Sequence, residues 1–331
     1  MTVATGVAKL VAFKKETYLA GFTAVSTTGG IYIRRITSDI DLSKDTYESN
    51  EIRADYQVGD MRHGMRKVGG SIKGELSPGA YDEFIGSILR KVFVAAPAPT
   101  MLALTVAAGT APQYTLTRGA GSFITDAVKI GQVARIASAA TGISSTDINK
   151  NLFVVGVSAT TLTVIPRDNL MTATTAATVV FATVGKYTWT PTTGHVNESY
   201  SVEHYYSDLV KGELFTGCRV NTVSLGLPAT GMATCDVAMM GVGFNEGFTG
   251  TVGAPVYATH LGTAQYFTTP TAAGTAGLLT AVAGVIRVNG VSVATVTGLT
   301  MDIQGGLTTG AVVGSNLTPD VFAGILERAI L

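Results

Sequence analysis

The pattern of apolar and polar positions predicts one helix, at residues 78–93, among many short strands. Ser77 can cap the start of this helix, and Pro78 suits its first position. Asp82 and Glu83 follow where the helix dipole favours anions. Apolar residues recur at three- and four-residue spacing on one face: Tyr81, Phe84, Ile85, Ile88, Leu89 and Val92. We therefore expect this face to pack back on a sheet.

Three strands are predicted before the helix, at residues 31–36, 39–48 and 68–76. The second of them places charges between apolar residues, which is typical of a half-exposed strand. Residues 1–30 show no clear periodicity. For them we expect an extended N-terminal arm that is ordered only against neighbouring molecules.

The densest run of charge in the chain lies between residues 51 and 67. It contains Glu51, Arg53, Asp55, Asp60, Arg62, Arg66 and Lys67. A short run of mixed sign is usually a solvated loop. The alternative is a loop that reaches a partner subunit, where mixed charges fix the register of the contact. Composition favours neither interpretation.

A separate unit is predicted in the middle of the chain. Residues 94–100 have the composition of a linker, and charges become sparse from 101 to 183. Short β-like runs follow one another at roughly ten-residue spacing: 102–106, 114–117, 132–136, 152–157, 161–165 and 178–181. This spacing predicts a small inserted sandwich or barrel. We divide the chain into a first core half at 1–100, an inserted β domain at 101–184 and a second core half at 185–331.

Strands resume in the last part of the chain. They are predicted at residues 186–190, 200–206, 217–227, 233–242 and 299–304. Asn289 and Gly290 predict a hairpin between 285–288 and 291–294, because both residues accept positive φ. The tail is ambiguous, since Thr318 and Pro319 can cap a helix although a strand is also compatible.

Composition adds two restrictions. The formal net charge is zero, so no general attraction to nucleic acid or to an anionic membrane is expected. Few charges and much Thr, Val, Ala and Gly favour an antiparallel β protein, part of whose surface is covered by copies of itself. No apolar run reaches the ~20 residues of a membrane span. We expect a soluble product made in the cytoplasm.

The search for chemistry predicts no catalytic, cofactor-binding or metal site. No phosphate-binding loop, His-Glu-x-x-His or Cys-x-x-Cys pattern occurs. Glu203 and His204 would point to opposite faces of a strand, which argues against a metal pair. Cys218 and Cys235 can be placed on neighbouring strands; buried free thiols are favoured over a disulfide. We therefore expect no enzyme.

Several stretches resemble tail tube proteins of long-tailed bacteriophages of the siphovirus type. Those in the N-terminal half are residues 11–17, 34–36, 42–52 and 68–79. Residues 200–206, 215–221 and the hairpin at 289–290 followed by 314–315 agree with them. The resemblance spans about residues 2–93 and 187–322, and leaves the middle insertion outside it.

The resemblance implies two packed antiparallel sheets, as a sandwich or barrel, with one flanking helix. It also implies hexameric rings that stack into a hollow, non-contractile tail tube for DNA passage. The expected partners are further copies of the chain, the tape measure, tail terminator and tail tip proteins, and transiently double-stranded DNA. Assembly would take place in the host cytoplasm, and the product would belong to the virion tail.

The resemblance also suggests contact residues. The segment from Glu51 to Lys67 would bridge rings, and Lys14, Lys15 and Glu16 of the N-terminal arm would touch an adjacent ring. The inserted domain would lie on the tube exterior, and the lumen would be acidic or neutral. For the C-terminal tail, the resemblance favours a strand. The alternative function is a virion decoration module whose insertion binds carbohydrate through aromatic residues in its loops.

Overall fold

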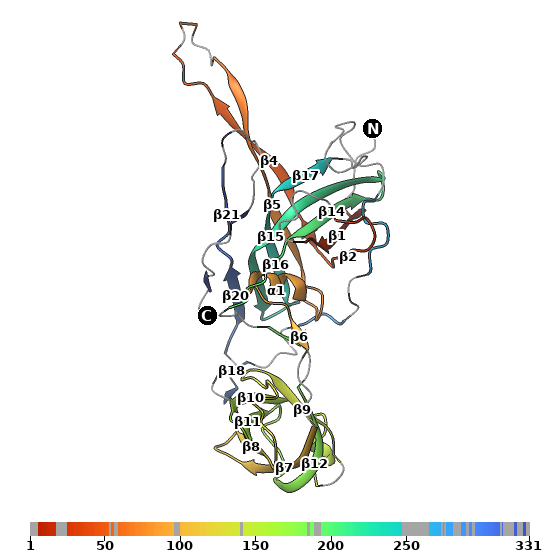
Figure 1. The fold of residues 1–331 in the computed structure, drawn as a ribbon, viewed down its shortest axis with the longest axis vertical. Coiled ribbons are helices and arrows are strands. Elements are labelled where there is room, and N and C mark those ends of the chain that lie inside the picture. The colour runs from red at the N-terminus through yellow and green to blue at the C-terminus, as the bar shows by residue number, and fades with distance from the viewer. Residues whose placement is uncertain are drawn as a thin grey trace. The chain divides into compact units, whose positions relative to one another are not determined.

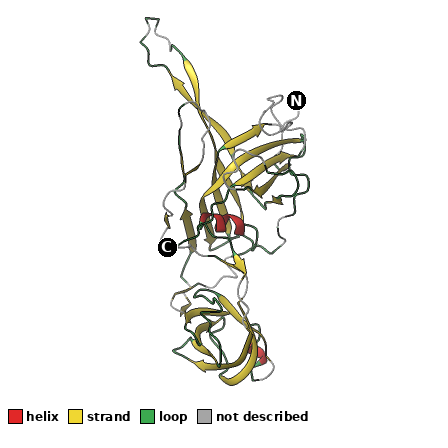
Figure 2. Cartoon of the chain, in the orientation of Figure 1, coloured by secondary structure: helices red, strands yellow, loops and turns green. Residues whose placement is uncertain are grey.

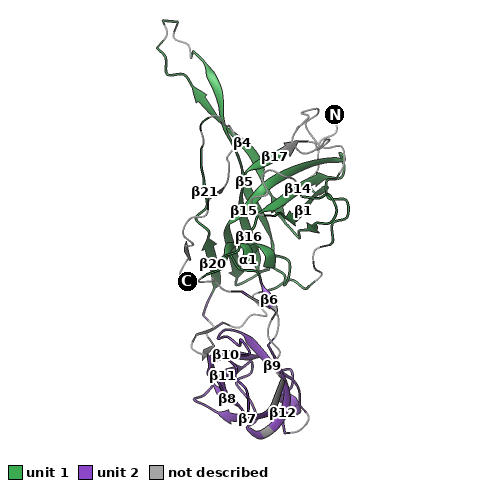
Figure 3. Ribbon diagram, viewed as in Figure 1, with its two compact units in different colours: residues 1–92, 189–284, 297–331 green, residues 93–188, 285–296 purple. Residues whose placement is uncertain are grey.

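The computed structural model describes residues 6–17, 25–52, 54–55, 59–95, 100–139, 142–183, 186–188, 193–246, 265–272, 274, 276–280, 286–288, 291–292, 295–311, 313, 321–322 and 327–328. Its described part is mainly β, with antiparallel sheets and one short α-helix, which confirms the predicted fold class (Figure 2). The chain forms two compact units (Figure 3). Unit 1 comprises residues 1–92, 189–284 and 297–331, and unit 2 comprises residues 93–188 and 285–296.

Unit 1 is built from two antiparallel sheets that share one long strand, β15 (Lys211–Pro228). The first sheet contains, in spatial order, β2 (Ile31–Tyr32), β1 (Lys9–Lys15), β14 (Tyr200–Tyr206), the first half of β15 and β17 (Gly243–Glu246). The second contains β4 (Asp41–Glu48) and β3 (Thr37–Ser38) on β5 (Met61–Glu75), then β16 (Thr234–Gly241), the second half of β15, β20 (Gly298–Gln304) and β23 (Glu327–Arg328).

The chain passes from one sheet to the other at Gly217. Its φ of +65° belongs to the left-handed region, which glycine adopts at little cost. A Cβ there would lie 3.0 Å from the Val242 side chain, so the position also needs a small residue. Val242 separates β16 from β17, and its N–H donates to the Thr216 carbonyl (3.1 Å). The chain therefore passes between the two sheets at neighbouring points, at Gly217 within β15 and at Val242 between β16 and β17.

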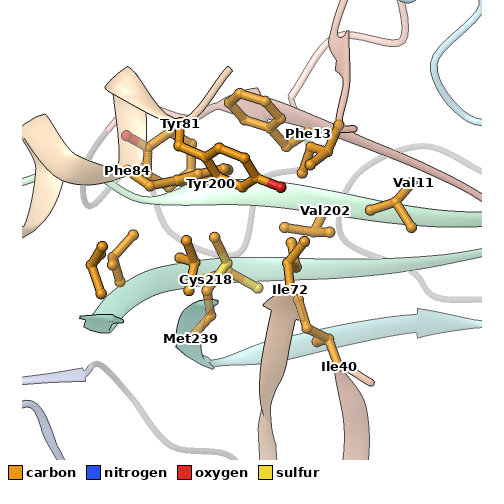
Figure 4. Packing of buried hydrophobic residues seen from close by; sticks show 14 of the residues in the cluster. Val11, Phe13, Ile40, Ile72, Tyr81, Phe84, Tyr200, Val202, Cys218 and Met239 are labelled. Atoms are coloured by element: carbon orange, nitrogen blue, oxygen red, sulfur yellow. The ribbon is translucent and has the colours of Figure 1, made fainter. Parts of the chain in front are cut away.

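Helix α1 (Asp82–Ile88) covers the apolar core of unit 1. The Phe84 ring lies 4.7 Å from that of Phe13 and 5.4 Å from that of Tyr200, measured between centroids (Figure 4). Buried side chains from both sheets complete the cluster, including Val11, Ile72, Val202, Phe215, Val223 and Val237. The prediction that the helix packs on a sheet is confirmed.

The helix is shorter than the predicted span of 78–93, and that boundary was wrong. Gly79 has a φ of +82°, so Pro78 opens a turn, and the buried Ser77 hydroxyl has no hydrogen-bond partner and caps nothing. At the other end, Arg90 adopts a φ of +55°. Its N–H and that of Lys91 donate to the carbonyls of residues 87 and 86, which is the Schellman pattern. Val92 consequently lies outside the helix.

The predicted N-terminal arm was wrong for residues 9–15, because they form an inner strand. β1 pairs with β14 along its whole length and with β2 at its centre. Val11, Ala12 and Phe13 are all buried. The predicted strand at 31–36 is also shorter than expected, since only residues 31–32 form β2 and the next strand begins at Thr37.

Unit 2 contains a closed antiparallel barrel. Its strands, in spatial order, are β10 (Leu152–Val157), β11 (Thr161–Pro166), β8 (Tyr114–Arg118), β7 (Thr100–Ala108), β12 (Thr174–Thr183) and β9 (Val133–Ala139), which returns to β10. Alternate residues such as Leu104, Leu116 and Ile136 fill the interior, as expected of a small barrel. All six predicted β runs are strands, and the barrel interpretation is confirmed.

Shorter elements complete the structure. A 3₁₀ turn, Ser145–Asp147, and the pairs β6 (Val94–Ala95) with β13 (Lys186–Tyr187) and β18 (Arg287–Val288) with β19 (Val291–Ser292) belong to unit 2. The turn residues Asn289 and Gly290 lie outside the described chain. In unit 1, β21 (Thr308–Thr309) pairs with β22 (Val321–Phe322). The described residues 321–322 and 327–328 are therefore extended, as the resemblance implied, and the helical alternative was wrong there.

Candidate assembly surface

A two-stranded ribbon leaves the second sheet of unit 1 (Figure 1). β5 pairs with β16 from Val68 to Glu75, whereas its residues 61–67 pair with β4 alone in the part of the chain that the structure describes. Beyond the strands, the Ser49 N–H donates to the Asp60 carbonyl (2.8 Å), which extends the ladder by one step. We call β4 and residues 61–67 the ribbon, and residues 49–60 its tip.

The predicted loop at 51–67 was therefore wrong for residues 61–67, which are strand. Their side chains alternate over a surface without a buried face, apart from the contact at Gly64. A Cβ at Gly64 would lie 2.6 Å from the Tyr47 ring, so this ring covers the glycine across the ribbon. A two-stranded ribbon has no further layer to pack against, and the Tyr47 ring supplies such a contact across the two strands.

Apolar side chains on the ribbon and its tip are exposed. Tyr47 and Met61 are each 59% exposed, and Ile52 is fully exposed. An exposed strand pair with free backbone edges and apolar side chains is a template for association. Tyr47, Ile52 and Met61 were not among the contact residues predicted from the sequence, because that prediction relied on charged residues.

The predicted charged residues lie around this ribbon. Arg62 forms an ion pair with Asp60 (2.6 Å), and Lys67 pairs with Asp45 (2.7 Å). Arg66 lies in register with Lys44, and like charges directly opposite each other on a strand pair destabilise it. An anionic partner near this pair would relieve the repulsion.

Two further predicted residues, Glu51 and Asp55, lie in the described part of the tip and are exposed. Arg53 lies outside the described residues.

The three predicted residues of the N-terminal arm have partners within the chain. The Lys14 ammonium donates to the Ser26 hydroxyl and to the Thr28 carbonyl, both at 2.6 Å. Lys15 pairs with the buried carboxylate of Glu198. These contacts hold β1 in place. The structure thus separates Lys14 and Lys15 from the ribbon.

Glu16 also binds within unit 1. Its Oε1 accepts hydrogen bonds from the Ser201 hydroxyl (2.6 Å) and from the Gly217 N–H (3.0 Å). This carboxylate therefore lies at the point where β15 changes sheet.

The edge of β20 offers a second surface for association. This strand pairs with β15 along its length, but on its other side β23 covers only Ile303 and Gln304. In the described part of the chain, residues 298–302 therefore have one β neighbour, β15. An open edge presents a row of N–H and C=O groups to another chain.

Two buried polar side chains of unit 1, Glu203 and His204, have hydrogen-bond partners in other segments. Glu203 accepts hydrogen bonds from the N–H groups of Tyr266 and Phe267, the latter at 3.1 Å. Burial raises the pKa of Glu203 above its usual value, and these two hydrogen bonds offset part of that rise. His204 Nε2 lies 2.7 Å from the Ser38 hydroxyl. Both residues thus join separate segments of the fold.

The two thiols are buried and are not joined in a disulfide, as favoured from the sequence. Burial raises the pKa of Cys235 to about 12. Among the described residues no group of three or more His, Cys, Asp or Glu side chains is arranged to hold a metal ion. No helix in the described ranges is long and apolar enough to span a bilayer.

These features define a mainly β protein with a projecting ribbon that carries exposed apolar side chains. The sequence matches the family model described as phage tail tube protein over residues 6–326. The chain therefore belongs to the phage tail tube protein family. It is a non-enzymatic component of the virion tail, as predicted. A comparison with curated proteins gave no match.

Proposed function

We propose that this tail tube protein closes into hexameric rings, and that stacked rings form the hollow tube through which DNA passes in a non-contractile tail. The observation that carries the proposal is the ribbon, whose residues 61–67 have β4 as their one described neighbour. Its free backbone edges are a template for pairing with another chain, and Met61 on the ribbon and Ile52 on the tip expose apolar side chains to water. A neighbouring subunit would cover them.

The two surfaces have different roles in this assembly. The β20 edge continues a sheet into the next subunit, and ring closure then removes free edges. The ribbon reaches a subunit of the adjacent ring and holds the two rings in register. A head-to-tail contact that does not close on itself produces an open stack. The neutral overall charge suits a subunit that is largely covered by its neighbours.

We place unit 2 on the exterior of the tube, because a barrel of this size would block a lumen sized for one duplex. The lumen would be neutral or acidic, so that DNA moves without sticking. The tape measure, tail terminator and tail tip proteins would meet the ends or the interior of this tube.

The decoration alternative gains no support from unit 2. It required aromatic residues gathered in the loops of the insertion. Phe123 and Phe181 instead lie in the barrel core, with ring centroids 6.0 Å apart, and Tyr114 packs against that core. Phe153 is partly exposed on strand β10.

Electron microscopy of the purified, concentrated chain tests the proposal. Wild-type protein should form rings and long hollow tubes. Met61→Asp replaces an exposed apolar side chain of the ribbon with a charge and should leave rings or monomers without tubes. Leu170→Asp in unit 2 is the matched control, because the two side chains are similarly exposed, 59% and 66%. Only monomers of wild-type protein, even at high concentration, would overturn the proposal.

A further inference from the structure

A groove in unit 1 combines apolar walls with two cations. It has a volume of about 780 Å³, within the range of roughly 300–1,000 Å³ that binding pockets occupy. Its lining includes Val7, Lys9, Leu10, Arg35, Ile36 and Tyr206, which come from β1 and the turn before it, the chain between β2 and β3, and the end of β14. We call it the cationic groove.

The two cations are held close together by the fold. The Lys9 ammonium donates to the Ser38 carbonyl (2.8 Å) and lies 5.7 Å from the centroid of the Tyr206 ring. The Arg35 guanidinium donates to the carbonyl of Lys9. Burial lowers the pKa of Lys9, and the charge of Arg35 lowers it further. The carboxylates of Glu213, Asp39 and Asp41 act on Lys9 in the opposite, weaker sense. An incoming carboxylate would stabilise this pair.

The apolar rim of the groove is open to water. Ile36 is 59% exposed, and Leu10 and Val7 are also exposed. The occupant must therefore bring both an apolar side chain and an anion. The ribbon tip has this combination, because the fully exposed Ile52 follows Glu51, and Glu48 lies at the end of β4.

The chain's own tip does not occupy its own groove. β3, which contributes Thr37 and Ser38 to the groove, pairs with β5 at Ile72 and Lys73. The ribbon ends at Met61 of the same extended strand, and a strand rises about 3.3 Å per residue. The described residues of the tip and the groove are thus separated along β5, and Ile52 is fully exposed.

We propose that the cationic groove receives the ribbon tip of a second copy, with Ile52 against Leu10 and Ile36 and with Glu48 or Glu51 facing Lys9 and Arg35. This inference rests on the proposed stacking of rings and names the receiving surface of that contact. Because tip and groove are different surfaces of one chain, each copy can give one tip and accept another. The contact therefore propagates along the stack.

Cysteine crosslinking of assembled tubes tests the pairing. Ile36→Cys and Ile52→Cys are prepared as single variants, mixed and treated with a short bismaleimide. A direct disulfide would demand Cα atoms about 4.4–6.8 Å apart, which is stricter than the proposal requires. The native Cys218 and Cys235 are both 0% exposed, so the wild-type chain provides the unreactive background. A crosslinked dimer is expected in the mixture and not in either variant alone.

Two comparisons make this result specific. The mixture of Ile52→Cys with Leu170→Cys, an exposed position of unit 2, should give no dimer. Adding Glu51→Lys to the Ile52→Cys chain should lower the dimer yield, because the tip then repels Lys9 and Arg35. Added salt should also lower the yield of the Ile36→Cys and Ile52→Cys mixture.

The outcomes separate the two proposals. Tubes without the Ile36–Ile52 crosslink would overturn the assignment of the groove and leave the tube assembly standing, with another segment covering the groove. A dimer of equal yield with Leu170→Cys would also overturn it. Absence of tubes at any concentration of the variants and of wild type would overturn both.

Discussion

The two units of this chain treat their strand edges in opposite ways. In unit 2 the barrel closes on itself through β9 and β10, so each barrel strand has two neighbours. In unit 1, residues 298–302 of β20 have β15 as their one described neighbour, and a ribbon leaves the second sheet. Exposed apolar side chains occur in both units, for example Leu170 and Met61. Strand edges without a described partner, more than side-chain character, therefore distinguish the unit for which we propose association.

The largest expected effect comes from matched core truncations. Phe215→Ala in unit 1 and Phe181→Ala in unit 2 each remove a fully buried ring and should cost about 3–5 kcal/mol of unfolding free energy. Calorimetry should show each variant lowering the melting transition of its own unit. Electron microscopy should show tubes lost in Phe215→Ala and kept in Phe181→Ala. Loss of tubes in Phe181→Ala would make unit 2 part of the assembly interface.

A smaller effect is expected from the buried carboxylates that join distant segments in each unit. Glu203→Ala leaves the N–H groups of Tyr266 and Phe267 without an acceptor, at about 1–3 kcal/mol for each. In unit 2 the N–H of Thr172 donates to Asp147 Oδ2 (2.9 Å), and Asp147→Ala leaves this N–H without its acceptor.

Hydrogen exchange is the measurement for this pair. Faster exchange should appear at residues 266–267 in the first variant and at residue 172 in the second, with the other unit unchanged. Glu48→Ala, which removes an exposed carboxylate, should leave both regions at wild-type rates. Changes that spread through both units would contradict their independence.

The smallest effect is a pH dependence confined to unit 1. Burial, reinforced by the charges of Lys9 and Arg35, lowers the pKa of His204 to about 2, and Glu213 Oε2 lies 3.9 Å from its Nδ1. The folded state keeps this histidine neutral, whereas the unfolded chain takes up a proton below its usual value of about 6.5. Stability of unit 1 should therefore fall as the pH is lowered from 6.5 to 5, by up to about 1.4 kcal/mol per pH unit.

Thermal melts between pH 5 and 7 test this slope. His204→Gln, whose amide can still reach Ser38, should flatten it, and His63→Gln on the exposed ribbon should not. The sequence of unit 2 contains no histidine, so its transition should not share this contribution. An unchanged slope in His204→Gln would assign the pH dependence to other groups, such as the carboxylates.

Sequence patterns predicted the barrel well and the N-terminal strand poorly, for one physical reason. Barrel strands have one solvent-exposed and one buried face, so buried residues such as Leu116 and Leu162 alternate with threonines. β1 lies inside a sheet with both faces covered around Val11, Ala12 and Phe13. In the sequence, β1 is therefore a short apolar run that lacks the alternation of apolar and polar residues by which strands are predicted. The predicted ends of α1 were wrong because Gly79 and Arg90 both have positive φ, so the helix begins after the one and ends before the other.

The site was predicted in part. Its charged residues were visible from the sequence, and the structure places Asp60, Arg62, Arg66 and Lys67 on the ribbon or its tip. The sequence did not single out Tyr47, Ile52 and Met61, because isolated apolar residues between charged ones form no periodic pattern. The Tyr47 contact with Gly64 depends on strand register, which the sequence alone leaves open.

The continuity of β5 has a mechanical consequence. One strand of fifteen residues runs from the ribbon to Glu75, and its inner half is bonded to β16 on one side and to β4 or β3 on the other. A pull on the ribbon along its axis loads these hydrogen bonds together, in shear, and they cannot open one at a time as in peeling. In a stack joined by such ribbons, tension would pass from each subunit directly into the sheet beneath the aromatic core. In a tail built in this way, each subunit would resist extension through the shear strength of this one strand.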